Sequence, residues 1–351
     1  MSLTHTDAVA SKNSLPKRRL GRTDMHITPV GLGAWAIGGG DWAVGWGSQD
    51  DKQSIAAIRH AAERGINWID TAAIYGLGHS EEIVRQALKD MPSAQRPFVF
   101  TKCGLRWDDD NRMAPPQNVG APASVRAECE ASLKRLGLER IDLYQMHWPA
   151  RDGTPIEDYW QTLIDLKAEG KVRAVGLSNH NVAQLTAAEK VRHVDALQPP
   201  FSAIRREFAA NELPWCLAHD TGVIVYSPMQ AGLLTGAFTA ERAKALPADD
   251  WRSRNAEFTG TKLTANLELA ETMKAVGKRH GTSAAAAAIA WTLAWPGVSG
   301  AIVGARKPSQ VDGWIDAATL HLRQVDLDEI ARTIDRTGAG VGPALPVEMA
   351  L

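Results

Sequence analysis

Short apolar runs alternate with longer amphipathic stretches along most of the chain. The apolar runs are rich in β-branched residues and predict eight strands, at residues 30–34, 66–70, 98–102, 141–147, 172–178, 193–198, 223–227 and 299–305. Between them, apolar residues recur with helical period at residues 50–65, 80–90, 123–137, 156–170 and 181–190. Several of these stretches open on an acidic or hydroxyl residue and close on glycine, as helices do.

The number of these units predicts the architecture. Eight strands that alternate with helices, with no change of composition between the two halves, indicate a single (β/α)8 TIM barrel rather than two domains. Residues 17–30 are predicted to form an N-terminal β-hairpin that turns at Gly21–Asp24 and plugs the bottom of the barrel. Residues 307–320 and 326–338 are predicted as extra C-terminal helices.

The same pattern sets the expected boundaries. We expect a barrel domain at residues 17–340, between a flexible N-terminal tail at 1–16 and a C-terminal tail at 341–351. The polar connection between Met229 and Thr261 is expected to be a surface loop near the active face.

Two segments allow other interpretations. Residues 281–305 carry no charge, but Pro296 and the glycines after it favour a buried helix followed by a core strand over a membrane span. Gly31, Gly33 and Ala36 match the G-x-G-x-x-A spacing of a dinucleotide-binding turn. The three glycines that follow disfavour the helix which that motif needs, so we expect a barrel strand and a loop.

Charge and cysteine content narrow the class of protein. The chain has 39 basic and 40 acidic side chains, which gives no electrostatic basis for binding nucleic acid or an anionic membrane. Cys103, Cys129 and Cys216 are too few and too far apart for a disulfide framework or a zinc site. The N-terminus has no apolar signal segment. We therefore expect a cytoplasmic protein without a bound metal, and the sequence carries no signal for its oligomeric state.

Candidate chemistry lies at the predicted strand ends, where TIM barrels carry their functional groups. Asp70, Lys102 and His147 end three successive strands, and Tyr75 follows Asp70 by five residues. Alone, each has a structural explanation: a helix cap, a surface lysine, a core histidine, a packed tyrosine. Together they form a proton donor, in which Lys102, held by Asp70, lowers the pKa of the Tyr75 hydroxyl toward operating pH and His147 orients the substrate oxygen or relays a proton.

These residues lie in motifs that resemble the aldo/keto reductase superfamily. "GINWIDTAAIYGLGHSEEIVRQAL" is similar to the first signature of that family, "FVFTKCG" contains its lysine and "IDLYQMHWP" its histidine. The resemblance runs from about Leu20 to about Ile330. It implies reversible hydride transfer between a nicotinamide and a carbonyl carbon, with Tyr75 as general acid in reduction.

The resemblance also implies cofactor contacts. Ser178, Asn179 and Gln198 would bind the nicotinamide carboxamide, and Tyr226 would stack on the ring. Arg306 would bind a 2′-phosphate, so NADPH is expected in preference to NADH. The implied cofactor-binding residues are Gly33, Ala34, Trp35, Asp70, Ser178, Asn179, Gln198, Tyr226, Ser227, Pro228, Met229, Gln230, Gly232, Gly304, Arg306 and Gln310.

Three positions depart from the family pattern. Gly313 and Trp314 stand where relatives usually have Glu and Asn near the adenine, and Ala237 stands where a lysine often clamps the pyrophosphate. Arg252 or Arg254 could replace that lysine, or be a solvated loop charge. Separately, Trp35, Trp107 and Trp148 fall in loops near the four catalytic candidates, where they either wall an apolar substrate pocket or serve packing.

The leading hypothesis is an NADPH-dependent reductase of a small-molecule carbonyl substrate. One alternative is an NADPH-binding regulatory subunit with slow turnover, since such subunits can keep the four catalytic residues. Another is a Schiff-base aldolase on the same barrel, in which the Lys102 amine attacks a carbonyl.

Overall fold

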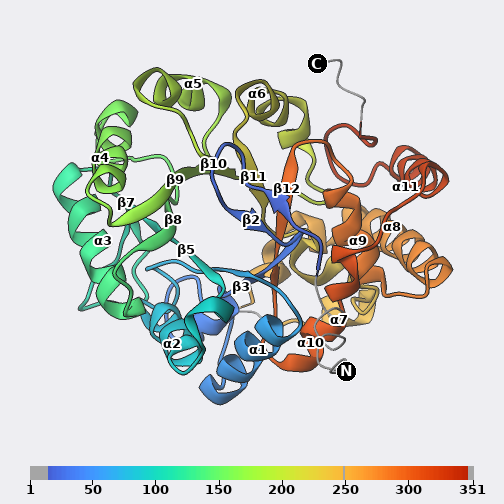
Figure 1. Cartoon of the computed structure of the whole chain (residues 1–351). Coiled ribbons are helices and arrows are strands. Elements are labelled where there is room, and N and C mark those ends of the chain that lie inside the picture. The colour runs from blue at the N-terminus through green and yellow to red at the C-terminus, as the bar shows by residue number, and fades with distance from the viewer. Residues whose placement is uncertain (1–14, 248–249, 347–351) are drawn as a thin grey trace, which may run out of the picture.

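Eight parallel strands close into a barrel surrounded by helices (Figure 1). The structure is a computed structural model that describes residues 15–247 and 250–346. The strands pair in the order β10-β11-β12-β3-β4-β5-β8-β9, so β12 pairs with β3 and closes the ring. Their bounds are β3 (Val30–Gly33), β4 (Trp68–Asp70), β5 (Phe98–Cys103), β8 (Ile141–Met146), β9 (Val172–Ser178), β10 (Ala196–Gln198), β11 (Gly222–Val225) and β12 (Val298–Gly304). All eight fall within two residues of the predicted runs at their carboxyl ends, and the predicted (β/α)8 barrel is confirmed.

Helices cover the outside of the barrel. The five predicted from period are α1 (Asp51–Glu63), α2 (His79–Leu88), α3 (Pro122–Leu136), α4 (Ile156–Ala168) and α5 (Val182–Val191). Local sequence sets their ends: the Asp50 side chain accepts a hydrogen bond from the Gln53 N–H at the start of α1, and Gly137 ends α3 in the left-handed region. The remaining helices are α6 (Glu212–His219), α7 (Ala240–Lys244), α8 (Gly260–Arg279), α9 (Ala284–Leu293), α10 (Pro308–Asp312) and α11 (Gln324–Thr337).

A hairpin fills one end of the barrel, as predicted. Strands β1 (Arg18–Arg19) and β2 (His26–Ile27) pair antiparallel, with the turn between them at Leu20–Met25. Leu20, Met25 and Ile27 are fully buried in one cluster with inward side chains of the barrel, including Trp68 and Phe100. The hairpin therefore closes the end of the barrel opposite to the carboxyl ends of the strands (Figure 1).

The glycine motif in β3 serves packing. A Cβ on Gly31 would lie 2.1 Å from the Trp68 ring, and one on Gly33 would lie 2.7 Å from Ile302. After β3 the chain forms only a three-residue 3₁₀ helix, η1 (Ala36–Gly38), and no helix N-terminus of the dinucleotide-binding type. The prediction of a strand and a loop is confirmed.

The uncharged segment also folds as predicted. Every residue of α9 is buried, and β12 follows it as a barrel strand. In the part of the chain that the structure describes, no helix is both long enough and apolar enough to cross a bilayer.

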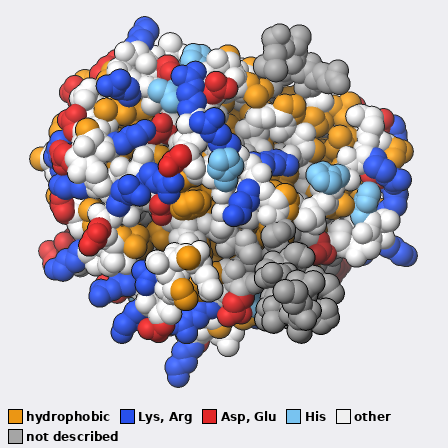
Figure 2. All heavy atoms as spheres, viewed as in Figure 1, with side chains coloured by type: hydrophobic (Ala, Val, Ile, Leu, Met, Phe, Trp, Pro, Cys, Tyr) orange, Lys and Arg blue, Asp and Glu red, His pale blue; other side chains and the backbone are white. Residues whose placement is uncertain are grey.

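Figure 2 shows acidic side chains among basic ones across the face in view. All three cysteines are buried as free thiols.

The connection from Met229 to Thr261 differs from the predicted surface loop. It contains α7 and the 3₁₀ helices η4 (Gln230–Thr235), η5 (Trp251–Arg254) and η6 (Ala256–Phe258), and α8 begins within it. Its isolated apolar residues, among them Leu233, Leu234 and Phe258, are buried in the main core. These few apolar side chains reach the core and anchor the segment. Because polar residues surround them in the sequence, the segment has the pattern of a surface loop.

The expected tails lie mostly outside the described residues. Of residues 1–16 only 15 and 16 are described, and of residues 341–351 those up to 346. The backbone carbonyls of Val341 and Gly342 accept hydrogen bonds from Arg206, which joins this end of the chain to the loop after β10.

Candidate active site

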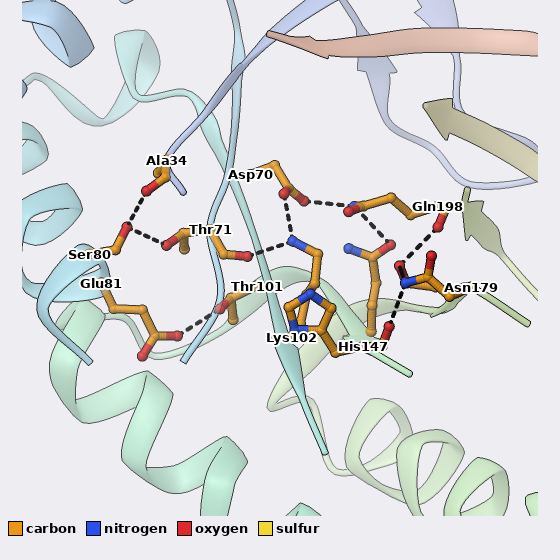
Figure 3. Close-up of polar contacts among 12 residues, drawn as sticks. Ala34, Asp70, Thr71, Ser80, Glu81, Thr101, Lys102, His147, Asn179 and Gln198 are labelled. Carbon is orange, nitrogen blue, oxygen red and sulfur yellow. Dashed lines mark hydrogen bonds and ion pairs between the residues drawn. The ribbon is translucent and has the colours of Figure 1, made fainter. Parts of the chain in front are cut away.

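The barrel brings Asp70 and Lys102 together at the ends of adjacent strands. The Lys102 Nζ lies 2.5 Å from Asp70 Oδ2 and donates a second hydrogen bond to the Thr71 carbonyl at 2.8 Å (Figure 3). Both side chains are buried. A buried lysine and carboxylate hold each other charged against the cost of leaving water.

Tyr75 and His147 complete the predicted group of four. Their rings pack edge to face with centroids 5.7 Å apart, and the Lys102 Nζ lies 5.2 Å from the centre of the Tyr75 ring. Both rings are half-buried, whereas Lys102 and Asp70 beneath them are closed to solvent. Tyr75 and His147 therefore form the more exposed side of the group.

The loop that holds Tyr75 is pinned at several points. Ser80, at the start of α2, donates a hydrogen bond from its Oγ to the Ala34 carbonyl at 3.0 Å and lies 2.9 Å from the Thr71 hydroxyl. Its backbone N–H donates to the Tyr75 carbonyl. The buried Glu81 accepts a hydrogen bond of 2.6 Å from Thr101, the residue before Lys102 (Figure 3). The signature segment thus ties α2 to β3 and β5.

The expected lowering of the Tyr75 pKa is wrong for the chain on its own. Burial, and then the Asp70 charge, raise the pKa of the Tyr75 hydroxyl well above its usual value. Asp70 lies 2.5 Å from Lys102 and balances its charge. The ion pair therefore lowers the Tyr75 pKa less than an unpaired lysine would. Burial, and then the Lys102 charge, lower the pKa of His147 well below its usual value, which keeps the imidazole neutral.

A second network links the acid group to the next strands of the barrel. Gln198, at the end of β10, donates from Nε2 to Asp70 Oδ1 at 2.8 Å, and its carbonyl accepts from the Ser178 hydroxyl at 2.8 Å. Asn179 donates from Nδ2 to the His147 carbonyl at 3.0 Å and accepts from the Tyr226 hydroxyl at 2.8 Å. The three predicted carboxamide residues and Tyr226 thus form one connected wall beside the group of four.

Sequence reasoning missed His180 and Tyr159. The buried His180 donates from Nδ1 to the Ser178 carbonyl at 2.8 Å and accepts from the Tyr159 hydroxyl at 2.9 Å. Burial lowers the pKa of His180 to about 4, so its ring is neutral and can accept that bond. Asn179, between Ser178 and His180, has a positive φ of 63°. The hydrogen bond from His180 to the Ser178 carbonyl holds this strained turn in place. The position of His180, two residues after Ser178, could have pointed to it. Nothing in the sequence indicates that Tyr159, on α4, is its partner.

The turn after β11, residues 227–232, is the candidate anion cradle. Ser227, Gln230, Ala231 and Gly232 all have positive φ, and the N–H groups of Gln230 and Gly232 donate to the carbonyls of Ser227 and Met229 within the turn. A Cβ added to Gly232 would meet no atom within 4 Å, so the space beside it is open. Arg252 donates to the Ala231 carbonyl at 3.5 Å, which places it beside the cradle, whereas Ala237 is exposed.

At the far end, Arg306 and Gln310 follow β12 on the exposed rim. Gly304 is exposed, and a Cβ on it would come no closer than 3.9 Å to Gly33 O, so a ligand could approach its backbone. The Gln310 Oε1 accepts a hydrogen bond from the Arg306 N–H at 2.7 Å. Trp314 is buried in the core, and the Gly313 carbonyl accepts from Ser283, so neither replaces the polar pair of other relatives.

Two of the three candidate pocket tryptophans contact the tyrosine region. Trp35 and Trp107 pack with Tyr75 around a small buried cluster that contains Trp42. Trp148 follows His147 but is 38% exposed and lies outside that cluster. In the part of the chain that the structure describes, no group of three His, Cys, Asp or Glu side chains is placed to hold a metal ion.

Comparison with known proteins identifies the family. The model of the "Aldo/keto reductase family" matches residues 29–335. The aldo-keto reductase YhdN of Bacillus subtilis is 35% identical over 323 residues, which cover 92% of this chain and 94% of the relative. The NADH-specific methylglyoxal reductase of Escherichia coli is 34% identical over 335 residues, covering 92% of this chain and all of the relative.

Solved structures agree. The glycerol dehydrogenase AKR11B4 of Gluconobacter oxydans superposes with a TM-score of 0.84 at 36% identity, over 95% of this chain and 99% of that one. The aldo-keto reductase AKR11C1 of Bacillus halodurans shares the fold, with a TM-score of 0.73 at 22% identity over 95% of this chain and 99% of that one.

Proposed function

This chain belongs to the aldo/keto reductase family, and from that membership we propose that it reduces aldehydes or ketones to alcohols with NADPH in preference to NADH. The observation that carries the proposal is the placement of Tyr75 and His147 over the buried Lys102–Asp70 pair. It is an accessible acid backed by a fixed charge, which is what protonation of a carbonyl oxygen requires.

In reduction, Tyr75 would give its hydroxyl proton to the substrate oxygen. The raised pKa keeps this proton in place until the oxygen gains negative charge. Lys102 would then stabilise the tyrosinate, and the neutral His147 would donate a hydrogen bond that orients the same oxygen. Asp70 holds Lys102 in position throughout.

The bound nicotinamide supplies the hydride. Ser178, Asn179 and Gln198 would hold its carboxamide, and Tyr226, fixed by its bond to Asn179, would pack against the ring. The cradle at Ser227–Gly232 would take the pyrophosphate. The main-chain rim at Gly33, Ala34 and Trp35 would border the nicotinamide half of the cofactor.

The choice of NADPH rests on Arg306, because a guanidinium binds a phosphate through two parallel hydrogen bonds. One relative is named as an NADH-specific enzyme, so the two coenzymes have to be compared directly. A cytoplasmic location is part of the same proposal, supported by three cysteines that are all free and buried.

The other two hypotheses are less well supported. The Lys102 amine is engaged by Asp70 and Thr71 and is closed to solvent, an arrangement that suits a fixed charge better than a nucleophile. An NADPH-binding regulatory subunit would share the site but turn over slowly, and only kinetics separates it from a reductase.

The test is NADPH consumption over a panel of aliphatic and aromatic aldehydes, ketones and sugars. We expect the Tyr75→Phe variant to lose about 10²- to 10⁴-fold in kcat, because it keeps the ring and loses the proton. Its affinity for NADPH, measured by fluorescence quenching, should stay within about twofold of wild type, since the ring still packs.

Equal rates for wild type and Tyr75→Phe on every substrate would reject catalysis and favour the regulatory subunit. Reduction by borohydride that traps a substrate on Lys102, without NADPH consumption, would favour the aldolase.

A further inference from the structure

Arg306 and Gln49 hold each other although 257 residues separate them. The Arg306 Nε donates to Gln49 Oε1 at 2.5 Å, and the Gln49 Nε2 donates back to the Arg306 carbonyl at 2.9 Å. A second guanidinium nitrogen of Arg306, Nη2, donates to the Ser48 carbonyl. The loop after β3 is thus fastened to the loop after β12 through one side-chain amide.

Gln49 is itself fixed to a rigid element. Its Nε2 also lies 3.0 Å from the hydroxyl of Ser54, a buried residue in the first turn of α1. Asp50, the next residue, caps that helix. On the other side, the Arg306 N–H is bound by Gln310. The backbone of Arg306 is therefore held by a residue of α10, and its head group by Gln49, which is tied to α1 through Ser54.

Among the described residues, the contacts of the Arg306 side chain occupy one edge of its guanidinium. Nε and one hydrogen of Nη2 form the edge that Gln49 and Ser48 occupy. Nη1 and the other hydrogen of Nη2 form the second edge, which has the same two-donor spacing. Because Gln49 is neutral, it fixes the guanidinium without cancelling its positive charge, which a carboxylate at this position would do.

We propose that Gln49 is a positioning residue that presents the free edge of Arg306 to the 2′-phosphate and so determines the preference for NADPH over NADH. This inference rests on the proposed role of Arg306 in coenzyme binding. An arginine that is already ordered loses less conformational entropy when it binds a phosphate, so the phosphate binds more tightly. NADH has no 2′-phosphate, and its affinity does not benefit from this ordering.

The experiment measures dissociation constants of NADP⁺ and NAD⁺ by fluorescence quenching, and of 2′-AMP and 5′-AMP by competition. For Gln49→Ala we expect NADP⁺ and 2′-AMP to bind about 3- to 10-fold more weakly, with NAD⁺ and 5′-AMP within about twofold of wild type. Gln49→Glu should weaken NADP⁺ further, because its carboxylate pairs with Arg306 and repels the phosphate. Gln53→Ala, an exposed residue on α1, is the matched control and should change nothing.

The outcomes separate the two proposals. If NADP⁺ binds Gln49→Ala as tightly as wild type, or more tightly, then Gln49 does not position Arg306, and the inference fails while the coenzyme proposal stands. Equal weakening of NADP⁺ and NAD⁺ would make Gln49 a general loop anchor and would also overturn it. If Arg306→Ala weakens both coenzymes alike, the phosphate role of Arg306 fails, and with it the inference. Thermal melting of each variant checks that the fold is intact.

Discussion

Tyr75 is held as a neutral phenol by its surroundings. Burial and the nearby Asp70 raise its pKa, and Lys102 is not free to oppose them because Asp70 holds it at 2.5 Å. The residue is therefore an acid kept ready rather than a pre-formed tyrosinate. Only an event that separates Lys102 from Asp70, or adds charge at the substrate oxygen, would draw its proton away.

This raised pKa predicts a different pH dependence for each direction of the reaction. Reduction needs the protonated tyrosine, and a raised pKa keeps it protonated, so the rate should be flat from about pH 6 to about pH 9. Alcohol oxidation needs the tyrosinate, whose population grows tenfold per pH unit below the pKa, so its rate should rise across the same range. Initial rates at saturating coenzyme and constant ionic strength measure both.

A fall in the reduction rate with a midpoint near pH 7 would contradict this expectation. It would mean that the pKa of Tyr75 in the complex lies far below that of the chain alone. The Tyr75→Phe variant, assayed in parallel, identifies any pH dependence that comes from other groups.

At the scale of single residues, the sequence predicts those site residues that lie at the ends of barrel strands. Asp70, Lys102 and His147 are identifiable because the chain shows where each strand stops, and barrel topology brings these ends together. Gln49 and His180 are not identifiable in this way. Their roles depend on Arg306 and Tyr159, partners whose proximity is decided by how loops and helices pack.

At the scale of elements, one buried carboxylate joins two outer helices. Asp326, on α11, accepts hydrogen bonds from His280 Nε2 at 2.8 Å and the Arg323 N–H at 3.0 Å, and it is paired with Arg279 at the end of α8. Burial raises the pKa of Asp326, but the hydrogen bonds from Arg323, His280 and Arg279 outweigh it, so the net shift is downward. The ionised form is thus the one that holds α8 to α11.

We expect Asp326→Asn to lower the free energy of unfolding by about 2–3 kcal/mol, because its amide turns a donor toward three donors. Urea unfolding at pH 7 measures the loss. Asp328→Asn, on the same helix and partly exposed, should cost under about 0.5 kcal/mol.

The pH dependence follows from the sign of the shift. A carboxylate whose pKa is lowered by folding stabilises the protein above its unfolded pKa, and that stability is lost as the pH falls toward the folded value. The difference between wild type and Asp326→Asn should therefore shrink from about pH 5 downward. A difference that stays constant to pH 3 would show that Asp326 acts by shape rather than charge.

The elements themselves were predictable to different degrees. The barrel strands stand out because they are short β-branched runs buried on both faces, and most of the covering helices because they have one apolar face. The 20-residue α8 has its apolar residues spread among Thr, Gly and Asn, which weakens the period. The short strands β6 (Leu105–Arg106) and β7 (Gln117–Asn118) exist only through pairing with each other. Such elements are fixed by tertiary contacts rather than by local pattern.

At the scale of the whole molecule, two loops from opposite halves of the chain meet through aromatic rings. Trp46 lies in the loop after β3. Its ring centroid is 4.9 Å from that of Trp35 and 6.0 Å from that of Trp251. The guanidinium of Arg252 lies 5.3 Å from the Trp46 ring centre and is paired with Asp250. This contact joins the loop that fastens Arg306 to the connection between β11 and α8.

We expect Trp46→Ala to speed release of the coenzyme, because the two loops lose the ring that connects them. Loss of these two aromatic contacts should increase the dissociation rate of the coenzyme about 2- to 10-fold, which stopped-flow fluorescence measures. Trp148→Ala is the matched control, since Trp148 is exposed and lies outside the contact. An unchanged dissociation rate in Trp46→Ala would show that the loops hold together without it.

The double use of Asp70 has an evolutionary consequence. One of its oxygens holds Lys102 and the other accepts from Gln198, so a single carboxylate connects the proposed proton donor with the proposed coenzyme wall. Mutations in these two halves should be epistatic, since a change to either partner alters the position of the other. A lineage that diverges in substrate or coenzyme would therefore change its loops first, and leave this shared carboxylate among the last residues to vary.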